Sequence, residues 1–146
     1  DPAEERLLIA VERPVVLVRQ RAGSGLAPEV APGNPLVGLL LAYTPLHHLL
    51  LEAAGRPLVM TSGNLSEEPM AARDGEALAR LAGIADLFLA HDREIENRCD
   101  DSVARVIAGR PTVFRRSRGY VPRALTLRRP VRRPVLACGA HLKNTF

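Results

Sequence analysis

"SVARVIAGRPTVFRRSR" (residues 102–118) predicts a β-hairpin. Apolar residues recur along two short arms, and a turn at Gly109-Arg110 separates them. The side chains expected to face one another are Val103, Val106 and Ile107 on the first arm and Val113 and Phe114 on the second. Because the chain also contains helix crossovers, the hairpin indicates a mixed α/β fold.

The chain before this hairpin alternates apolar runs with turns rich in glycine and proline. Strands are expected at residues 13–21, 36–42, 56–62 and 85–92, with a further one at 134–140. Helices are expected at residues 2–12, 45–55 and 73–82. In the second helix Thr44 is the N-cap, Pro45 opens the first turn and Gly55 ends the helix. The expected fold class is α/β, a twisted mixed sheet with flanking helices.

Composition narrows the classes of function. The chain has 146 residues and 47% hydrophobic content, which suffices for one domain with a core. Aromatic residues make up only 3%, which argues against the base-stacking surfaces of single-strand nucleic-acid binders. Two cysteines without a C-x-x-C pair form neither a disulfide framework nor a zinc knuckle, so a reducing, cytoplasmic location is expected. No apolar run is long enough to span a membrane.

The net charge of +4 is unevenly distributed. Arginines crowd residues 115–134, where no acidic residue occurs. Such a stretch is either a solvated basic linker or a surface that faces phosphate or RNA. Within it, Arg116 and Arg118 are candidates for phosphate binding, since guanidinium groups match phosphate oxygens, but plain surface charge explains them equally well.

The polar turn "TSGNLS" (residues 61–66) directly follows an expected strand. Ligands often contact such turns, and Thr61, Ser62, Asn64 and Ser66 supply hydroxyl and amide groups suited to a phosphate or nucleotide. Gly63 lets the backbone approach a ligand closely. The alternative interpretation is an ordinary turn without a ligand.

The run "HDREIENRCDDSVARV" (residues 91–106) holds the second candidate cluster. Asp100 and Asp101 are adjacent like charges, which require a compensating cation, either a nearby arginine such as Arg93 or Arg98 or the magnesium of a nucleoside triphosphate. A salt-bridged turn that opens the hairpin is the alternative. His91 is a candidate general acid–base or carboxylate-binding group.

Two other signals are weaker. Cys99 has no paired base, so a nucleophilic role is disfavoured and a buried thiol is the expectation. His47 and His48 project about 100° apart on a helix and make a poor metal site.

Taken together, "YTPLHHLLL", "RPLVMTSGNLSEEP", "HDREIENRCDDSVARV", "RRSRGYVPR" and "GAHLKNTF" resemble the HypF family of carbamoyltransferases, which act in [NiFe]-hydrogenase maturation. The resemblance covers nearly the whole chain. It implies that residues 1–127 are the C-terminal part of a YrdC-like domain, that 128–133 are a linker and that 134–146 begin an actin-like ATPase-fold carbamoyl-transfer domain. Because neither end resembles a natural terminus, a fragment of a longer protein is expected.

The resemblance also implies a reaction. Such an enzyme takes carbamoyl phosphate and ATP, joins carbamate to AMP with release of pyrophosphate, and passes the carbamoyl group to the C-terminal cysteine of HypE. ATP and magnesium are the implied cofactors, and zinc is expected only in parts of the longer protein that this chain lacks. The fragment alone is expected to be inactive.

Roles for individual residues follow from the same resemblance. The nucleotide- and phosphate-binding candidates are Thr61, Ser62, Asn64, Ser66, Arg98, Ser102, Arg116 and Arg118. The catalytic candidates are His91 and Arg93, which would face carbamate, and Asp100 and Asp101, which would orient arginines or magnesium.

One departure and two alternatives accompany this interpretation. The family usually has glycine after "TSGNLS", where this chain has Glu67, and its charge would repel ATP unless the side chain points away. A YrdC-type threonylcarbamoyl-AMP synthase for tRNA modification and a double-stranded RNA-binding module are the alternative functions. The scarce aromatic residues and the acidic pair argue against the RNA-binding module.

Overall fold

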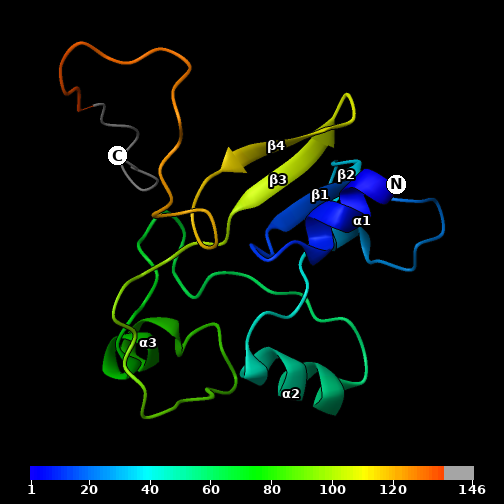
Figure 1. The fold of residues 1–146 in the computed structure, drawn as a ribbon. Helices are drawn as coiled ribbons and strands as arrows, with labels where there is room; N and C mark the ends of the chain where they lie inside the picture. The colour runs from blue at the N-terminus through cyan, green and yellow to red at the C-terminus, as the bar shows by residue number, and fades with distance from the viewer. Residues whose placement is uncertain (137–146) are drawn as a thin grey trace. The chain divides into compact units, whose positions relative to one another are not determined.

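The computed structural model describes residues 1–136 and contains a four-stranded sheet in the order β2-β1-β3-β4 (Figure 1). The elements are α1 (Pro2–Ile9), β1 (Val15–Arg19), the 3-10 helix η1 (Pro28–Val30), β2 (Leu36–Leu39), α2 (Pro45–Ala54), α3 (Asp74–Leu81), β3 (Val103–Ile107) and β4 (Arg110–Arg115). β1 runs antiparallel to β2 and parallel to β3, and β3 runs antiparallel to β4. The expected mixed α/β fold class is confirmed.

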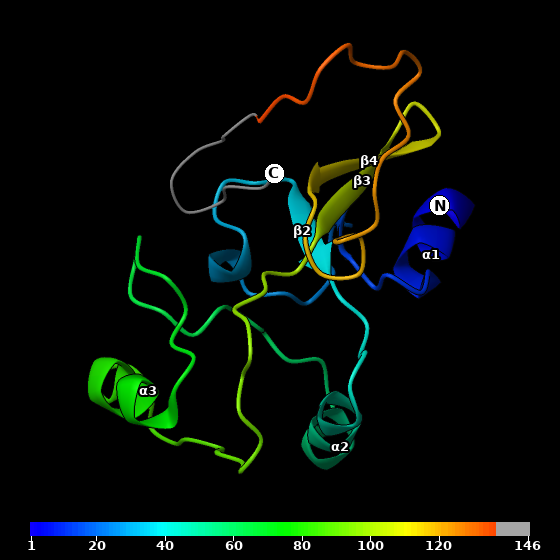
Figure 2. The same cartoon turned by 60° about the vertical axis from the view of Figure 1, so that its left-hand side comes forward.

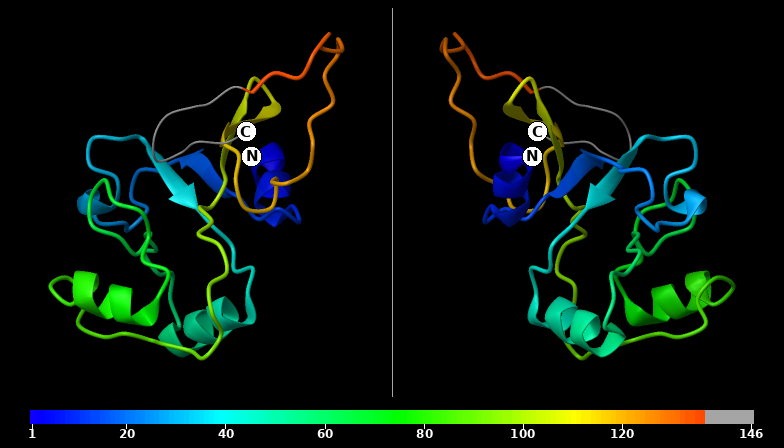
Figure 3. Two further views of the ribbon diagram at one scale, coloured as in Figure 1. Left: turned by 90° about the vertical axis from the view of Figure 1, so that its left-hand side faces the viewer. Right: turned by 90° about the vertical axis from the view of Figure 1, so that its right-hand side faces the viewer.

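The chain divides into two compact units. The sheet unit comprises residues 1–60 and 99–123, and the loop unit comprises residues 61–98 together with the stretch that begins at 124. In the sheet unit, α1 packs against β1, β3 and β4 (Figure 2). By contrast, α2 has no buried residue and lies away from the strands of its own unit (Figure 3).

The core of the sheet unit is small. Val16 in β1 is fully buried, and its register partners are Leu39 on one side and Ala104 on the other. Leu7 of α1 covers this point and, with Val16 and Ala104, forms the buried apolar cluster. Burying a side chain of this size contributes about 1.5–3 kcal/mol. So few buried apolar groups leave the fold dependent on polar contacts as well.

The predicted helices are confirmed because their end signals act locally. Asp1 and Glu4 form a reciprocal capping box at the start of α1. At α2 the Thr44 hydroxyl accepts a hydrogen bond from the His47 N–H at 3.2 Å, and Gly55 adopts the left-handed conformation with φ of 61°. None of the helices in residues 1–136 is long and apolar enough to cross a membrane.

The strands predicted at residues 56–62 and 85–92 are wrong, because both segments are irregular in the structure. An apolar run forms a strand only where a neighbour pairs with its backbone groups, and no sheet partner meets these two runs in the described part of the chain. Their side chains are correspondingly open to solvent, with Val59 71% and Leu87 90% exposed. Of the strand expected at 134–140, residues 134–136 are irregular and the rest lie outside the described residues.

The hairpin at residues 102–118 is confirmed, but its turn lies one residue earlier than predicted. Ile107 pairs with Arg110, so Ala108 and Gly109 form the turn, with φ of 49° and 74°. Two consecutive positive φ angles match the twist of a two-residue hairpin turn. This register places Val113 opposite Ala104 rather than opposite the valines predicted to face it.

Two glycines provide a matched test of this fold. Gly119 has φ of 86°, and an added Cβ would lie 2.5 Å from the Glu12 carbonyl oxygen, whereas Gly109 has φ of 74° and open space around the same position. Both alanine substitutions incur a left-handed backbone cost of about 1–2 kcal/mol. Gly119→Ala also forces a backbone clash, so its loss of unfolding free energy should exceed that of Gly109→Ala by about 1–3 kcal/mol in urea denaturation. Equal losses would show that the chain after β4 does not approach Glu12 so closely.

Candidate functional site

Arg118 organises one end of the sheet unit. Its Nε donates to Asp101 Oδ1 at 2.7 Å, and its terminal nitrogens donate to the carbonyls of Glu12 at 3.1 Å and Arg13 at 2.6 Å. The guanidinium carbon lies 3.4 Å from the ring centroid of Tyr43, a cation–π contact. We call these five residues the Arg118 corner. Three of the five N–H groups of Arg118 therefore contact protein groups.

Ser102 joins this corner to the start of β3. Its side chain is fully buried, donates to the Arg118 carbonyl at 2.9 Å and accepts from the Ser117 N–H at 2.7 Å. The Arg118 N–H in turn donates to the Asp100 carbonyl at 3.2 Å. The described contacts of Ser102 are thus all with the protein backbone.

The aspartates and the other predicted arginine of the sheet unit also have protein partners. Asp100 lies 4.0 Å from Arg115, and Asp101 pairs with Arg118. Arg116 donates to the carbonyls of Tyr120, at 2.9 Å, and Arg123. The aspartate pair is expected either to face the magnesium of a nucleotide or to form a salt-bridged turn, and these contacts are those of a salt-bridged turn.

Burial raises the pKa of Tyr43, and the negative charge of Asp101 adds to that increase while Arg118 opposes it. The phenol therefore stays protonated at neutral pH, because its ordinary pKa is already 10.0. It serves as a flat, neutral surface for the guanidinium. Tyr43 lies within a motif that carries the family resemblance, but the sequence alone does not indicate this stacking role.

In the loop unit, the predicted turn at residues 61–66 is exposed and internally hydrogen-bonded. The Ser62 hydroxyl donates to Asn64 Oδ1 at 2.5 Å, and the Asn64 N–H donates to the Ser62 carbonyl at 3.1 Å. Within residues 1–136 the backbone N–H groups of Ser62, Gly63, Leu65 and Ser66 have no acceptor. These four N–H groups lie on exposed residues and, with the Ser66 hydroxyl, form a cluster of available donors, as an anion requires. The hydroxyls of Thr61 and Ser62 already donate, to the Ser62 carbonyl and to Asn64 Oδ1.

Glu67 immediately follows this turn and adopts φ of 64°. That left-handed backbone conformation favours glycine. The geometry gives a physical reason why a glycine suits this position in the family pattern.

His91 and Arg93 line a cavity of about 700 Å³ in the loop unit. The Arg93 N–H donates to His91 Nδ1 at 3.2 Å, so the neutral imidazole carries its proton on Nε2. The remaining lining residues are Ala72, Arg73, Asp74, Asp92, Glu94, Ile95 and Glu96. Among residues 1–136 no group of three or more His, Cys, Asp or Glu side chains is arranged to hold a metal ion.

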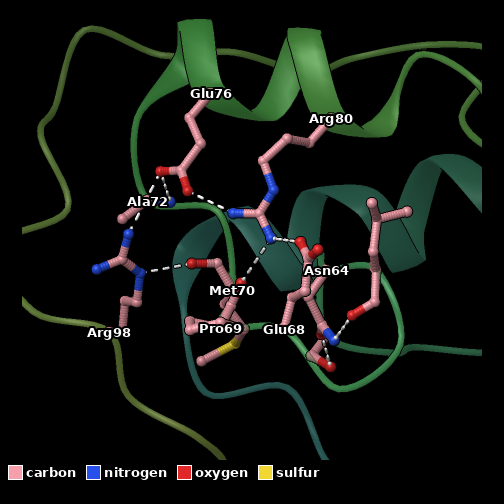
Figure 4. Close-up of polar contacts among 10 residues, drawn as sticks. Asn64, Glu68, Pro69, Met70, Ala72, Glu76, Arg80 and Arg98 are labelled. Carbon is pink, nitrogen blue, oxygen red and sulfur yellow. Dashed lines mark hydrogen bonds and ion pairs between the residues drawn. The ribbon is translucent and has the colours of Figure 1, made fainter.

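Arg98, the remaining predicted phosphate ligand, contacts a backbone carbonyl and a carboxylate of the loop unit. Its Nε donates to the Met70 carbonyl at 2.5 Å, and a terminal nitrogen lies 3.3 Å from Glu76 (Figure 4). Glu76 also pairs with Arg80 one turn further along α3. The i,i+4 spacing of Glu76 and Arg80 signals their pairing in the sequence, but nothing there indicates the link to Arg98.

Cys99 departs from expectation, because the thiol is exposed rather than buried. Its sulfur lies 3.7 Å from the hydroxyl of Ser117.

Comparison with known proteins gives consistent matches. The family model Sua5_yciO_yrdC, described as "Telomere recombination", matches residues 1–117. The carbamoyltransferase HypF of Synechocystis sp. is 49% identical over 142 residues, which cover 97% of this chain and 18% of that protein. The carbamoyltransferase HypF of Rhizobium leguminosarum bv. viciae is 50% identical over 153 residues, which cover 99% of this chain and 20% of that protein.

A solved structure is similar as well. The crystal structure of full-length HypF in the phosphate- and nucleotide-bound form matches with a TM-score of 0.83 and 45% identity, over 90% of this chain and 21% of that chain. The chain therefore spans about a fifth of the length of these relatives.

Ser102 provides a test of the Arg118 corner. Ser102→Ala leaves the part-buried Ser117 N–H without its acceptor, which should lower the free energy of unfolding by about 1–3 kcal/mol. Ser117→Ala is the control, since within residues 1–136 that hydroxyl contacts only the thiol of Cys99, and its effect should stay within about 0.5 kcal/mol. Denaturant unfolding of both variants measures the difference, and equal effects would contradict the assigned role of Ser102.

Acid titration tests the contacts of Glu76. The Ala72 N–H, then the hydrogen bond from Arg80, hold the pKa of Glu76 below its ordinary value of 4.5. A depressed folded-state pKa stabilises the fold above the unfolded pKa, and that contribution is lost as pH falls through the folded pKa. The stability difference between wild type and Glu76→Gln should therefore be constant near neutrality and shrink below about pH 4.5. A difference that does not change with pH would contradict these contacts.

Proposed function

The chain belongs to the Sua5, YciO and YrdC family, and from this premise we propose that it is the part of a HypF-type carbamoyltransferase in which carbamoyl-adenylate forms. The proposal is supported by relatives named carbamoyltransferase HypF at about 50% identity across nearly the whole chain. It is also supported by a solved relative described as phosphate- and nucleotide-bound.

The observation that carries the proposal is the donor cluster at residues 61–66. Four backbone N–H groups that have no acceptor within residues 1–136 lie in this exposed turn, together with the hydroxyl of Ser66. Such groups bind phosphate oxygens without requiring a charged side chain. In the free protein, water can accept hydrogen bonds from these exposed N–H groups, so they carry no desolvation penalty. The phosphate oxygens of a triphosphate can replace that water.

The proposed reaction needs charge stabilisation more than covalent help. A carbamate oxygen attacks the α-phosphorus of ATP, and the bond from that phosphorus to the β-phosphate oxygen breaks, so its electron pair leaves with pyrophosphate. Backbone donors at residues 61–66 would stabilise the oxygens that gain charge. Magnesium bound to the triphosphate would add charge neutralisation. Asp100 and Asp101 are each paired with an arginine. These pairs are consistent with the proposal that the aspartates orient arginines.

The later steps are part of the same proposal. The carbamoyl group passes to the C-terminal cysteine of HypE and becomes a cyanide ligand of hydrogenase iron. Carbamoyl phosphate, ATP and HypE are then the partners of the longer protein. His91 and Arg93 line a cavity of about 700 Å³ and are the groups that we propose face carbamate.

A second candidate function is threonylcarbamoyl-AMP synthesis for tRNA modification. The observation that favours it is the name of the matched family model, which refers to Sua5, YciO and YrdC. Both candidates use the same adenylation chemistry, so they differ in the carboxylate that attacks ATP. The exposed arginines Arg128, Arg129, Arg132 and Arg133 support an RNA-facing surface in either case.

The test is pyrophosphate exchange into ATP by the full-length protein, with and without carbamoyl phosphate. Ser62→Ala with Asn64→Ala removes a hydroxyl and the amide that shape the donor cluster, so carbamoyl-phosphate-dependent exchange should fall about tenfold or more. Ser24→Ala, in the exposed "GSG" turn of the sheet unit, is the control and should exchange normally.

Three results would contradict the proposal. Normal exchange by the double variant would remove the role of residues 61–66. Exchange that requires threonine and bicarbonate would favour the second candidate. Exchange under neither condition, with steeply salt-dependent RNA binding, would favour a binding module.

A further inference from the structure

The loop of residues 61–72 is held by side chains of the loop unit rather than by a sheet. Arg98 donates to the Met70 carbonyl at 2.5 Å, and Arg80 donates to the Pro69 carbonyl at 3.3 Å and pairs with Glu68 (Figure 4). Two arginines from distant parts of the sequence thus converge on the end of one loop.

Glu76 connects these two arginines. One carboxylate oxygen accepts from Arg80 at 2.5 Å, and the other accepts from the Ala72 N–H at 3.3 Å and from Arg98 at 3.3 Å. We call Glu76, Arg80 and Arg98 the brace. Each guanidinium contacts the same carboxylate, so removal of Glu76 would take one anchor from both. Arg80 would keep Glu68 and the Pro69 carbonyl, and Arg98 would keep the Met70 carbonyl.

Three consecutive residues link the brace to the donor cluster. Met70 and Ala72 are bound to the brace through a carbonyl and an N–H. Between them, the Ala71 N–H donates to the Gly63 carbonyl at 2.9 Å. Ala71, which closes the turn, is therefore flanked on both sides by residues that the brace holds, and Gly63 lies within the turn that carries the donor cluster.

We propose that the brace positions residues 62–66 for phosphate, which makes Glu76, Arg80 and Arg98 positioning residues and Arg98 no direct phosphate ligand. This inference rests on the proposed function of the turn. The charges of the cluster support a positioning role, since the two arginines are balanced by Glu68 and Glu76. Together with Glu68, the brace therefore adds no net positive charge that would attract an anion.

Because of this charge balance, two possible roles of Glu76 predict opposite changes in ATP affinity when Glu76 is removed. If Glu76 acted only through its charge, its removal would make the loop more positive and tighten ATP binding. If it positions the turn, its removal disorders the donors and weakens ATP binding. The direction of the change in KM for ATP distinguishes the two.

The experiment uses the full-length protein with Glu76→Ala and Glu76→Gln. Two readouts are needed: the KM for ATP in carbamoyl-phosphate-dependent pyrophosphate exchange, and hydrogen–deuterium exchange of the peptide that contains Ala71, measured without nucleotide. Glu76→Ala should raise KM about five- to tenfold with the maximum rate within about twofold, and the Ala71 amide should exchange faster. Glu76→Gln, which keeps one acceptor oxygen, should be intermediate, and it stands in if the alanine variant does not fold.

Asp86→Ala is the control, because it removes the same charge from an exposed position of the loop unit that has no partner within residues 1–136. It should change neither readout. A lower KM in Glu76→Ala, or an unchanged KM with faster Ala71 exchange, would overturn the positioning role. Unchanged Ala71 exchange would overturn the brace itself.

The two proposals fail in different ways. If the wild-type protein shows no exchange that depends on carbamoyl phosphate, the proposed function fails, and with it the link between the brace and phosphate. The amide exchange of Ala71 needs no nucleotide, so it still decides whether Glu76 holds the loop.

Discussion

One guanidinium group holds the sheet unit together where its apolar core cannot. Arg118, in the chain after β4, contacts the backbone before β1, the aspartate before β3 and the tyrosine after β2. The buried apolar cluster consists of Leu7, Val16 and Ala104, so the ends of the strands depend on this polar corner. Its parts support one another, because Tyr43 gives the guanidinium a neutral face and Ser102 satisfies the backbone groups beside it.

The same principle operates in the loop unit with different residues. Arg98 and Arg80 hold backbone carbonyls of the loop, and Glu76 orients both. Arginines that sequence reasoning assigned to phosphate thus contact the protein's own carbonyls and carboxylates in both units. Their assignment to phosphate stays a prediction, while the free donors near residues 61–66 are mostly backbone groups. Backbone donors carry no side-chain signature, so a sequence motif indicates them only through its small residues.

Features that depend on residues close together in the sequence can be predicted from the sequence. Thr44, Pro45 and Gly55 define α2 because each acts within one turn of helix. The apolar runs at residues 56–62 and 85–92 have the pattern of strands but are irregular, since periodicity gives no information about a pairing partner. The small polar residues at 61–66 indicate that turn, whereas no local signal indicates the roles of Tyr43 and Glu76, because these depend on residues distant in sequence. The left-handed conformation of Glu67 could be inferred only from the glycine that the family has there.

In the proposed function, residues 61–66 present backbone donors to phosphate. The most direct measurement is hydrogen–deuterium exchange of the full-length protein with and without a nonhydrolysable ATP analogue. We expect the nucleotide to slow exchange of the amides of Ser62, Gly63, Leu65 and Ser66, which have no acceptor within residues 1–136. Protection confined to the arginine-rich stretch at residues 128–133, with residues 61–66 unchanged, would contradict it.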